Sequence, residues 1–343
     1  MGIKDLNAFL KARAPNAIKQ ITLSDIKKIV NPDDLKKPLR VSIDTSIYFY
    51  KFLYKNPRFI EGFFQQITRL MRNNIIPIYV FDGKPPVEKT DVLVVRKEKK
   101  QEYKTRIADL EEKMLNPEET DDNKVNFKIE MDKLKKKLIF VTKEHNETLK
   151  YFLDMMNIKY IQADCEADVI CSKLCENKVV DMVLSDDMDL LVSGSKILLR
   201  DFFVTTNKIS VYIVSEILES LDITYDQWID FCILCGCDYQ GRIPGVGSKG
   251  AYKYIKTYGD IENVIQNVCG EGKKHTLPEN YDFENARKLF KKCDYYYNEY
   301  NDIKVEVEDL FDNQLDNIRK FLIKHCNLSE KQINNRLKFI YKI

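Results

Sequence analysis

"VVDMVLSDDMDLLVSG", residues 179–194, places three aspartates directly behind an apolar run. Val179–Leu184 has the composition of a buried strand, and Asp186, Asp187 and Asp189 follow it. Like charges repel one another, and burial disfavours the ionised form of a carboxyl group. The stretch therefore predicts a buried strand whose end faces something positively charged.

Two other predicted strands end in the same way. "LRVSID" ends at Asp44 and "IIPIYVFD" ends at Asp82. The carboxyl ends of parallel strands lie at one edge of an α/β sheet, where such sheets bind ligands. "DCEADV" adds Glu166 and Asp168 at the start of a predicted helix, and Asp238 in "CGCDYQG" follows a buried helix. We therefore expect a set of seven carboxylates at this edge, made of these five together with Asp187 and Asp189.

Seven convergent carboxylates predict bound divalent cations. A single aspartate after a strand is most often a helix cap or a turn residue, but all seven cannot be caps. Left unpaired they would repel one another, and some would remain protonated. Mg²⁺ and Mn²⁺ prefer oxygen ligands, and two ions that share ligands can activate water and stabilise the leaving oxygen in phosphodiester cleavage. The sequence predicts two Mg²⁺ ions, for which Mn²⁺ can substitute.

Two other classes of protein with aspartates at strand ends do not fit the whole set. A dehalogenase-type phosphatase needs D-x-D on its first strand, and "SIDTSI" has a single aspartate followed by Thr45. A phospho-receiver domain is much shorter and needs neither "EAD" nor Asp238. The carboxylates are therefore better explained by a two-metal site.

The order of the elements predicts an α/β fold. In the first half, apolar strands alternate with amphipathic helices, which is typical of a mostly parallel central sheet with helices on both faces. Residues 91–138 are charged and helix-prone with a weak apolar stripe, so they predict two helices that project from the core. These helices are either a solvated hairpin or a mobile lid or arch. After Val214 the pattern is mostly helical and is expected to pack onto the sheet in one compact unit.

Composition limits the classes of protein further. The chain has 343 residues, 44% hydrophobic and 31% charged, with a formal net charge of +2. It contains no apolar run long enough to span a membrane and no signal peptide at its start, so we expect it not to be secreted and to have no membrane partner. The nine cysteines are expected to be free thiols, and with three histidines in the chain a zinc site at Cys232 and Cys235 is disfavoured.

A second motif predicts contact with a phosphate backbone. "GRIPGVGSKGAYKYI", residues 241–255, has the pattern of a helix–hairpin–helix. Its glycines let the backbone approach a phosphate closely, and N–H groups at the start of the following helix face the anion. Lys249 and Lys253 add positive charge. Such a hairpin recognises nucleic-acid structure rather than base sequence.

These motifs together resemble the flap endonuclease family of structure-specific 5′ nucleases, and the flap endonuclease branch in particular. The resemblance is carried in order by "MGIKDL", "SIDTSIYFYKFL", "IPIYVFDGKPP", "VTKEHNE", "EAD", "SDDMDLL", "FCILCGCDY" and "IPGVGSKGA", over nearly the whole chain. It implies a PIN-like 5′ nuclease fold in one domain, 1–343. Within it the resemblance implies an N-terminal region 1–107, an arch 91–138, an internal region 139–258 with the helix–hairpin–helix at 228–256, and C-terminal helices 259–343.

The resemblance also implies roles for single residues. Asp44, Asp82, Glu166 and Asp168 look like the first metal cluster, and the second is Asp187, Asp189 and Asp238 with Asp168 shared. Lys89 and Arg96 match the basic residues that steady the scissile phosphate, and Tyr50 matches an aromatic that stacks on a base. The hairpin at 245–247 resembles a potassium-assisted contact to duplex DNA. The implied DNA contacts are Gly2, Tyr50, Arg69, Gly236, Gly245, Gly247 and Lys249.

The sequence departs from the family in four places. The family has Glu where Asp168 stands, which shortens the reach of that carboxylate by about 1.5 Å. "ITLSDIKKIVNPDDLKKPL" is a longer link than usual, and "LFKKCDYYYNEY" does not match the family near its duplex-binding end. No Q-x-x-[ILM]-x-x-aromatic-aromatic motif follows "NNRLKFIYKI", so sliding-clamp docking by that route is not expected.

Two functions follow from these expectations. The first is a Mg²⁺-dependent 5′ flap endonuclease and 5′–3′ exonuclease that acts on branched or flapped DNA as a monomer, in the nucleus or at a cytoplasmic site of DNA replication such as a viral factory. The second is a branched-DNA binding scaffold without catalysis. The presence of all seven carboxylates and both basic residues favours the enzyme.

Overall fold

The computed structural model describes residues 2–116, 119–203, 205–291 and 312–341. At its centre is a seven-stranded sheet in the order β1-β7-β6-β5-β2-β3-β4. The strands from β6 to β4 are parallel, whereas β7 is antiparallel to both β6 and β1. The predicted mostly parallel sheet is confirmed. The strands are β1 (Ile18–Thr22), β2 (Leu39–Asp44), β3 (Ile75–Phe81), β4 (Tyr160–Gln162), β5 (Met182–Leu184), β6 (Ile197–Arg200) and β7 (Lys208–Ile213).

Two details of the sheet differ from the sequence prediction. The strand expected over Val179–Leu184 begins only at Met182, because the N–H groups of Val179 and Val180 donate to the carbonyl of Leu174 at the end of the preceding helix. Strand β1 was not predicted. It lies at the edge of the sheet, where none of its residues is fully buried, so it lacks the alternation that marks a half-buried strand.

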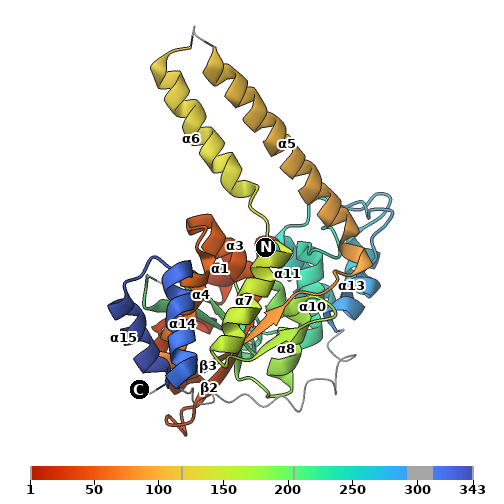
Figure 1. Cartoon of the computed structure of the whole chain (residues 1–343). Coiled ribbons are helices and arrows are strands. Elements are labelled where there is room, and N and C mark those ends of the chain that lie inside the picture. Colours follow the sequence, from red (N-terminus) through yellow and green to blue (C-terminus); the bar gives the residue numbers. More distant parts are fainter. Residues whose placement is uncertain (1, 117–118, 204, 292–311, 342–343) are drawn as a thin grey trace.

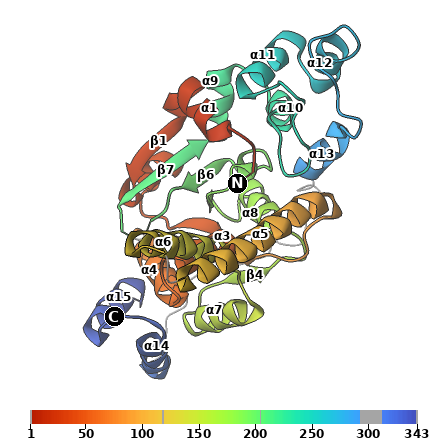
Figure 2. The same ribbon diagram turned by 90° about the horizontal axis from the view of Figure 1, so that it is seen from above.

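Helices cover both faces of the sheet, as predicted (Figure 2). In β2 the side chains of Val41 and Ile43 pack on one face with aromatic residues, while Ser42 points to the other face and donates to the carbonyl of Cys171. One layer contains α1 (Leu6–Arg13), α8 (Ala167–Glu176), α9 (Val214–Leu221), α10 (Tyr225–Cys235), α11 (Ser248–Tyr258), α12 (Ile261–Val268) and α13 (Phe283–Phe290). The other contains α2 (Ile26–Val30), α3 (Thr45–Lys55), α4 (Phe59–Arg72), α7 (Lys143–Met155), α14 (Asp312–His325) and α15 (Glu330–Tyr341).

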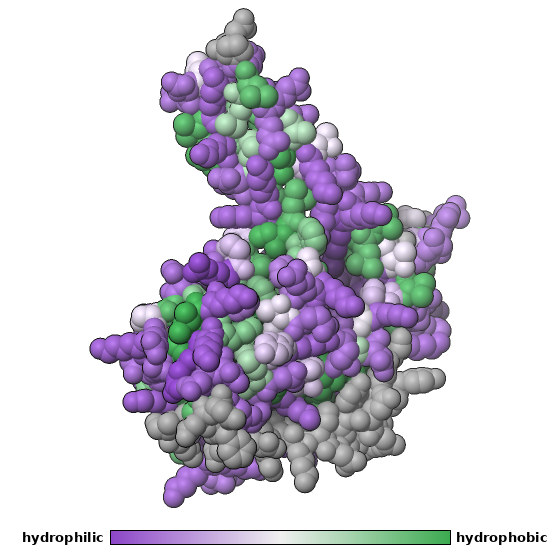
Figure 3. Space-filling view, viewed as in Figure 1, coloured by the Kyte–Doolittle hydropathy of each residue, from purple (hydrophilic) through white to green (hydrophobic). Residues whose placement is uncertain are grey.

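Two helices project from this body as an antiparallel pair, which we call the arch (Figure 1). They are α5 (Thr90–Leu115) and α6 (Asp121–Lys137), which match the expected range 91–138 except that α5 begins one residue earlier. Ion pairs between Arg106 and Glu130 and between Lys135 and Glu111 join them. The face of the arch seen in Figure 3 is mostly hydrophilic with scattered apolar side chains, as the weak apolar stripe predicted.

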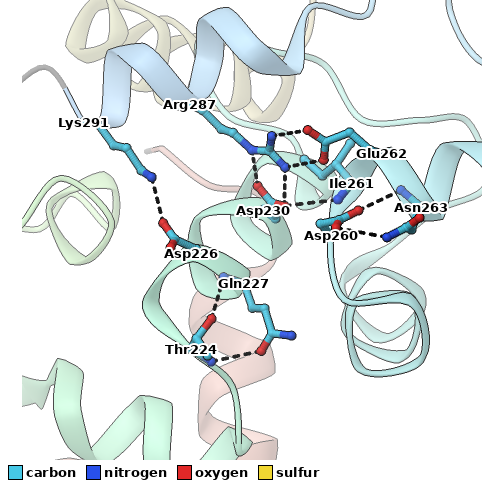
Figure 4. Close-up of polar contacts among 10 residues, drawn as sticks. All are labelled: Thr224, Asp226, Gln227, Asp230, Asp260, Ile261, Glu262, Asn263, Arg287 and Lys291. Carbon is cyan, nitrogen blue, oxygen red and sulfur yellow. Dashed lines mark hydrogen bonds and ion pairs between the residues drawn. The ribbon is translucent and has the colours of Figure 1, made fainter.

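Three helices of the C-terminal half are joined by ion pairs around the buried Asp230 (Figure 4). Arg287 of α13 donates hydrogen bonds to Asp230 of α10 and to Glu262 of α12. None of the described helices is long and apolar enough to cross a membrane. Most of the segment "LFKKCDYYYNEY", which departs from the family, lies outside the described residues.

Candidate active site

Three adjacent strands deliver carboxylates to one edge of the sheet. Asp44 is the last residue of β2, and Asp82 directly follows β3, its parallel neighbour. β5 pairs with the other side of β2, and Asp187 and Asp189 follow it. The strand order therefore brings together the ends that the sequence predicted to meet.

The start of α8 is bound to the end of β3. The N–H of Ala167 donates to Oδ1 of Asp82 at 2.8 Å, and the N–H of Gly83 donates to the Cys165 carbonyl at 2.7 Å. A Cβ on Gly83 would overlap the backbone of residues 163 and 164, so only glycine permits this close approach. Glu166 is the N-cap of α8 and Asp168 lies in its first turn, so both carboxylates are placed beside Asp82.

A chain of hydrogen bonds links Asp44 to the aspartates after β5. The Ser185 hydroxyl donates to Oδ2 of Asp44 at 3.2 Å and accepts from the N–H of Asp187 at 3.2 Å. The N–H of Asp189 donates to Oδ1 of Asp187 at 3.1 Å. Gly2 lies directly against this pair, because a Cβ there would overlap the carboxylates of both Asp187 and Asp189. Gly2, which was predicted as a DNA contact, therefore lies beside the second cluster of carboxylates.

The base of the arch brings two cations to the carboxylates. Nζ of Lys89 is 2.8 Å from Oε1 of Glu166 and 4.0 Å from Oδ2 of Asp238. Nη2 of Arg96, in the second turn of α5, is 3.0 Å from the same oxygen of Asp238. Lys89 is buried and lies 5.0 Å from the ring centre of Tyr239. The two basic residues predicted from the sequence therefore lie at the carboxylates.

Burial and mutual repulsion raise the pKa of several of these carboxyl groups, which favours their neutral form. Burial raises the pKa of Asp168 to about 7, and the charge of Lys89 only partly opposes this rise. Burial likewise raises the pKa of Asp44 well above its usual value, with added repulsion from Asp82, Asp168 and Asp187. The pKa of Asp189 is also raised by burial and by neighbouring aspartates. The cluster would be stabilised by additional positive charge.

The donor set fits hard divalent cations by its chemistry. Two buried carboxylate oxygens, Oε2 of Glu166 and Oδ1 of Asp189, have no hydrogen-bond partner in the described part of the chain. The donors of the site are carboxylate oxygens, which suit Mg²⁺ or Mn²⁺. Among the described residues, however, no three acidic, histidine or cysteine side chains converge closely enough to hold one metal ion. Other carboxylate oxygens of the site accept hydrogen bonds within the protein. Asp82 accepts from Ala167, Asp44 from Ser185, and Glu166 from Lys89.

Asp186 does not belong to the cluster, although it lies in the aspartate stretch with Asp187 and Asp189. Its Oδ2 is 2.8 Å from Nζ of Lys51, and its Oδ1 accepts from the N–H of Asp201 at 2.9 Å. Consecutive residues after a strand point in different directions, so a run of aspartates divides between two environments.

Of the other predicted DNA contacts, one lies on α3 and four lie at the end of α10 or the start of α11. Tyr50 is exposed on α3. Gly236, at a φ of +86°, ends α10, and Gly245 and Gly247 form the hairpin that leads into α11. Lys249 is exposed in the first turn of α11.

Arg69 is half-buried and contacts other parts of the protein. Its guanidinium donates to the carbonyls of Phe203 and Thr206 and lies 5.0 Å from the ring centre of Phe202. These contacts hold the loop after β6, so in the free protein Arg69 is a structural anchor. Sequence inspection could not reveal this, because the partners are more than 130 positions away.

Three site residues were missed by the sequence analysis. Ser46 donates to Oδ2 of Asp82, and Ser185 donates to Asp44. Tyr239 packs against the Lys89 ammonium. Each lies within two residues of a predicted carboxylate or at the end of its strand, and this proximity in sequence is the available signal.

Comparisons with known proteins agree with this geometry. The family model of the XPG N-terminal domain matches residues 1–103, and that of the XPG I-region matches residues 157–238. Flap endonuclease 1 of Plasmodium falciparum is 34% identical over 372 aligned positions that cover 100% of this chain and 53% of that protein. The chain thus spans about half the length of that relative. Flap endonuclease 1 of Danio rerio is 33% identical over 359 positions, covering 100% of this chain and 87% of that protein.

A solved structure has the same fold. The catalytic core of Rad2 in complex with DNA substrate superimposes with a TM-score of 0.63 at 21% identity, over 98% of this chain and 99% of that one. The seven-stranded sheet with its helical layers is therefore the PIN-like fold of the 5′ nucleases. Because the similarity to flap endonuclease 1 of Danio rerio covers the whole of this chain and 87% of that protein, the chain belongs to the flap endonuclease family.

Proposed function

We propose that this chain is a metal-dependent, structure-specific nuclease that cuts DNA at 5′ flaps and degrades it from 5′ ends. The observation that carries the proposal is the set of carboxylates at one sheet edge, beneath an arch whose base supplies Lys89 and Arg96. The names of relatives that match the whole of this chain support the flap substrate. The alternative, a scaffold that binds branched DNA without cutting it, would not need these buried charges.

We propose that two Mg²⁺ ions bind at the carboxylates. Bound Mg²⁺ would supply an activated water and offset the negative charge that develops on the phosphate. Asp168 would be shared between the two sites, and small side-chain rotations would bring the oxygens together. The proposed first site is Asp44, Asp82, Glu166 and Asp168, and the second is Asp187, Asp189 and Asp238 with Asp168.

Lys89 and Arg96 would exchange one anionic partner for another. In the free protein they neutralise Glu166 and Asp238. Burial lowers the pKa of Lys89, but the charges of Asp168 and Glu166 raise it more, so this lysine stays fully protonated. With Mg²⁺ bound to the carboxylates, Lys89 and Arg96 would be free to contact the scissile phosphate, where a fixed positive charge would stabilise the transition state.

Branched DNA is the proposed partner, bound by a monomer. The Rad2 core has been solved with a DNA substrate, and its fold extends over nearly all of this chain. We propose that Tyr50 stacks on a base near the cut, and that the hairpin at 245–247 with Lys249 contacts the duplex backbone with help from K⁺. In this arrangement Arg69 would act through the loop that it holds.

The test measures cleavage and binding separately on a labelled 5′-flap duplex. The parent should cut it in Mg²⁺. Asp187→Ala should bind the flap in Ca²⁺ about as well as the parent, yet lose most Mg²⁺-dependent cleavage, since a metal ligand acts on the transition state and phosphate contacts supply most of the affinity.

Asp186→Asn is the matched control, because Asp186 is the neighbour of Asp187 but its carboxylate binds Lys51 outside the cluster. It should retain cleavage. Binding without cleavage by the parent in Mg²⁺ or Mn²⁺ would support the scaffold instead. Near-parental cleavage by Asp187→Ala would exclude Asp187 from the metal site.

A further inference from the structure

His275 lies beneath the glycine hairpin although it belongs to a different loop. It follows α12 and stands 31 positions after Pro244. Its buried ring has Nδ1 at 3.1 Å from the Pro244 carbonyl and Nε2 at 2.8 Å from the hydroxyl of Tyr254 in α11. The ring therefore joins the hairpin to the helix that follows it.

The two partners determine which ring nitrogen carries the proton. A backbone carbonyl only accepts hydrogen bonds, so Nδ1 must be protonated and donate to Pro244. In the neutral ring Nε2 then accepts from the Tyr254 hydroxyl. The rings of His275 and Tyr254 also meet edge to face, with centres 5.7 Å apart. Both nitrogens have a partner, so the orientation of the ring is fixed.

The backbone of His275 is anchored independently of the hairpin. Its N–H donates to the Val268 carbonyl at 3.0 Å, and its carbonyl accepts from the N–H of Gly270 at 3.1 Å. Both partners lie at the end of α12 or just beyond it. His275 thus forms a fixed support for the hairpin rather than a side chain that moves with it.

The hydrogen bond to Pro244 sets the direction of the next N–H group. In a trans peptide the C=O and the following N–H point in opposite directions, and the described residues contain no cis peptide. With the Pro244 carbonyl held toward His275, the N–H of Gly245 points away from it. That N–H donates to no hydrogen bond within the described residues. A Cβ on Gly245 would lie 3.2 Å from Nδ1, which shows how closely the ring supports this peptide.

We propose that His275 is a positioning residue for duplex DNA: it holds the Pro244–Gly245 peptide so that the Gly245 N–H faces outward to donate to a backbone phosphate. The inference rests on the proposed function, because it assumes that the hairpin contacts DNA. It adds a residue outside the helix–hairpin–helix motif that determines whether the motif is competent to bind.

The test compares two flap substrates in Ca²⁺, one with a duplex arm long enough to reach the hairpin and one with an arm too short. His275→Phe keeps a ring but loses both hydrogen bonds. It should bind the long-arm substrate about 10-fold more weakly, the effect of one charge-assisted hydrogen bond, and bind the short-arm substrate as the parent does. Its single-turnover cleavage rate at saturating DNA should be unchanged.

Three further variants keep the test decisive. His275→Asn restores an N–H donor near the position of Nδ1 and should recover most of the long-arm affinity. Tyr254→Phe removes only the hydroxyl and should give a smaller loss in the same direction. His325→Phe is the matched control, since that ring stacks on Phe321 in α14, and it should leave both affinities unchanged. Thermal unfolding of each variant checks that it is folded at the assay temperature.

A second measurement locates the phosphate. Neutral methylphosphonate is substituted at one position after another along the long arm. In the parent one substitution should weaken binding, and in His275→Phe the same substitution should have no further effect, because the two changes remove the same contact.

The outcomes separate the two proposals. If the parent binds long-arm and short-arm substrates equally, the proposed contact of the hairpin with DNA is wrong. If the parent binds the long-arm substrate more tightly than the short-arm substrate, and His275→Phe shows the same difference, His275 does not position the hairpin. An equal loss of affinity on both substrates would assign His275 a role in folding alone and overturn the inference.

Discussion

At the scale of single residues, Asp168 shows how the site opposes the stability of the fold. Its pKa is raised by burial to about 7, from 3.8 in the unfolded chain. At a pH below the pKa of the unfolded chain, such a carboxyl group is protonated in both the folded and the unfolded state, so it does not lower the free energy of unfolding. As pH rises from about 4 to 7, the unfolded state ionises more readily than the folded state, so the free energy of unfolding falls. The free protein should therefore be less stable at pH 8 than at pH 5.

Asp168→Asn should remove this cost. In EDTA at pH 8 we expect the variant to unfold at a higher temperature than the parent, by roughly 2–4 °C for each kcal/mol recovered. The difference should shrink at pH 5, and Mg²⁺ should raise the melting temperature of the parent more than that of the variant. Asp164→Asn, an exposed neighbour, is the control and should change little. A variant less stable than the parent at pH 8 in EDTA would contradict the electrostatic account.

At the scale of elements, the hairpin contains two glycines that serve different purposes. Gly245 has a φ of +79° and lies against His275, whereas Gly247 has an ordinary φ of −94° and open space where a Cβ would be. Gly245 is thus required by the fold itself. The fold does not require a glycine at position 247. The missing side chain there would instead allow a ligand to approach the backbone closely.

The two single alanine variants should therefore separate folding from binding. Gly245→Ala should lower the free energy of unfolding by about 1–2 kcal/mol, the cost of a left-handed residue with a Cβ. Gly247→Ala should leave stability within about 0.5 kcal/mol of the parent yet weaken long-arm duplex binding. Chemical denaturation and binding in K⁺ and Na⁺ at equal ionic strength measure both effects. Unchanged duplex affinity in Gly247→Ala would argue against a phosphate at this glycine.

The base of the arch is the second element with a testable role. Arg96→Ala should reduce the single-turnover rate by roughly 10²-fold, with a smaller effect on binding, as for loss of one preorganised electrostatic contact. Lys89→Ala should do at least as much, since it also leaves Glu166 without its cation. Lys135→Ala, in an exposed ion pair on the arch, is the control. If Arg96→Ala binds more weakly but cuts bound DNA at the parental rate, Arg96 only contributes to a basic surface.

At the scale of the whole molecule, one half-buried arginine, Arg287, joins three helices of the layer that contains the hairpin. The Asp230 carboxylate is buried in α10 and also accepts from the N–H of Ile261 at the start of α12 (Figure 4). Arg287 of α13 neutralises it and reaches Glu262 as well. Losing one partner of such a pair leaves a buried charge, which costs more than the pair itself contributes.

Arg287→Ala should therefore destabilise the protein strongly, by roughly 3–5 kcal/mol. The neighbouring pair of Lys291 and Asp226 is exposed and provides the matched control. Lys291→Ala should change the free energy of unfolding by less than about 1 kcal/mol. Urea denaturation of both variants measures the change in the free energy of unfolding. Equal changes would show that Arg287 is not needed to neutralise the buried carboxylate of Asp230.

The sequence by itself determined the features that local pattern specifies. Apolar runs that end in aspartate gave β2, β3 and β5 with their carboxylates at one edge, because strand direction in a parallel sheet leaves only one place for those ends. The charged range 91–138 gave the arch, since too few apolar residues were present for a buried layer. Gly245 in "IPGVG" gave the turn of the hairpin, because glycine readily adopts a positive φ.

Only the tertiary structure decided which side chains meet across long stretches of chain. Asp186 turns to Lys51, 135 positions away, and so leaves the cluster that its two neighbours join. Arg69 is held by a loop 134 positions away, and β1 finds its partner in β7. His275 reaches the hairpin only because α12 returns the chain beneath it. Such pairings depend on packing between distant elements, and no periodicity or local spacing encodes them.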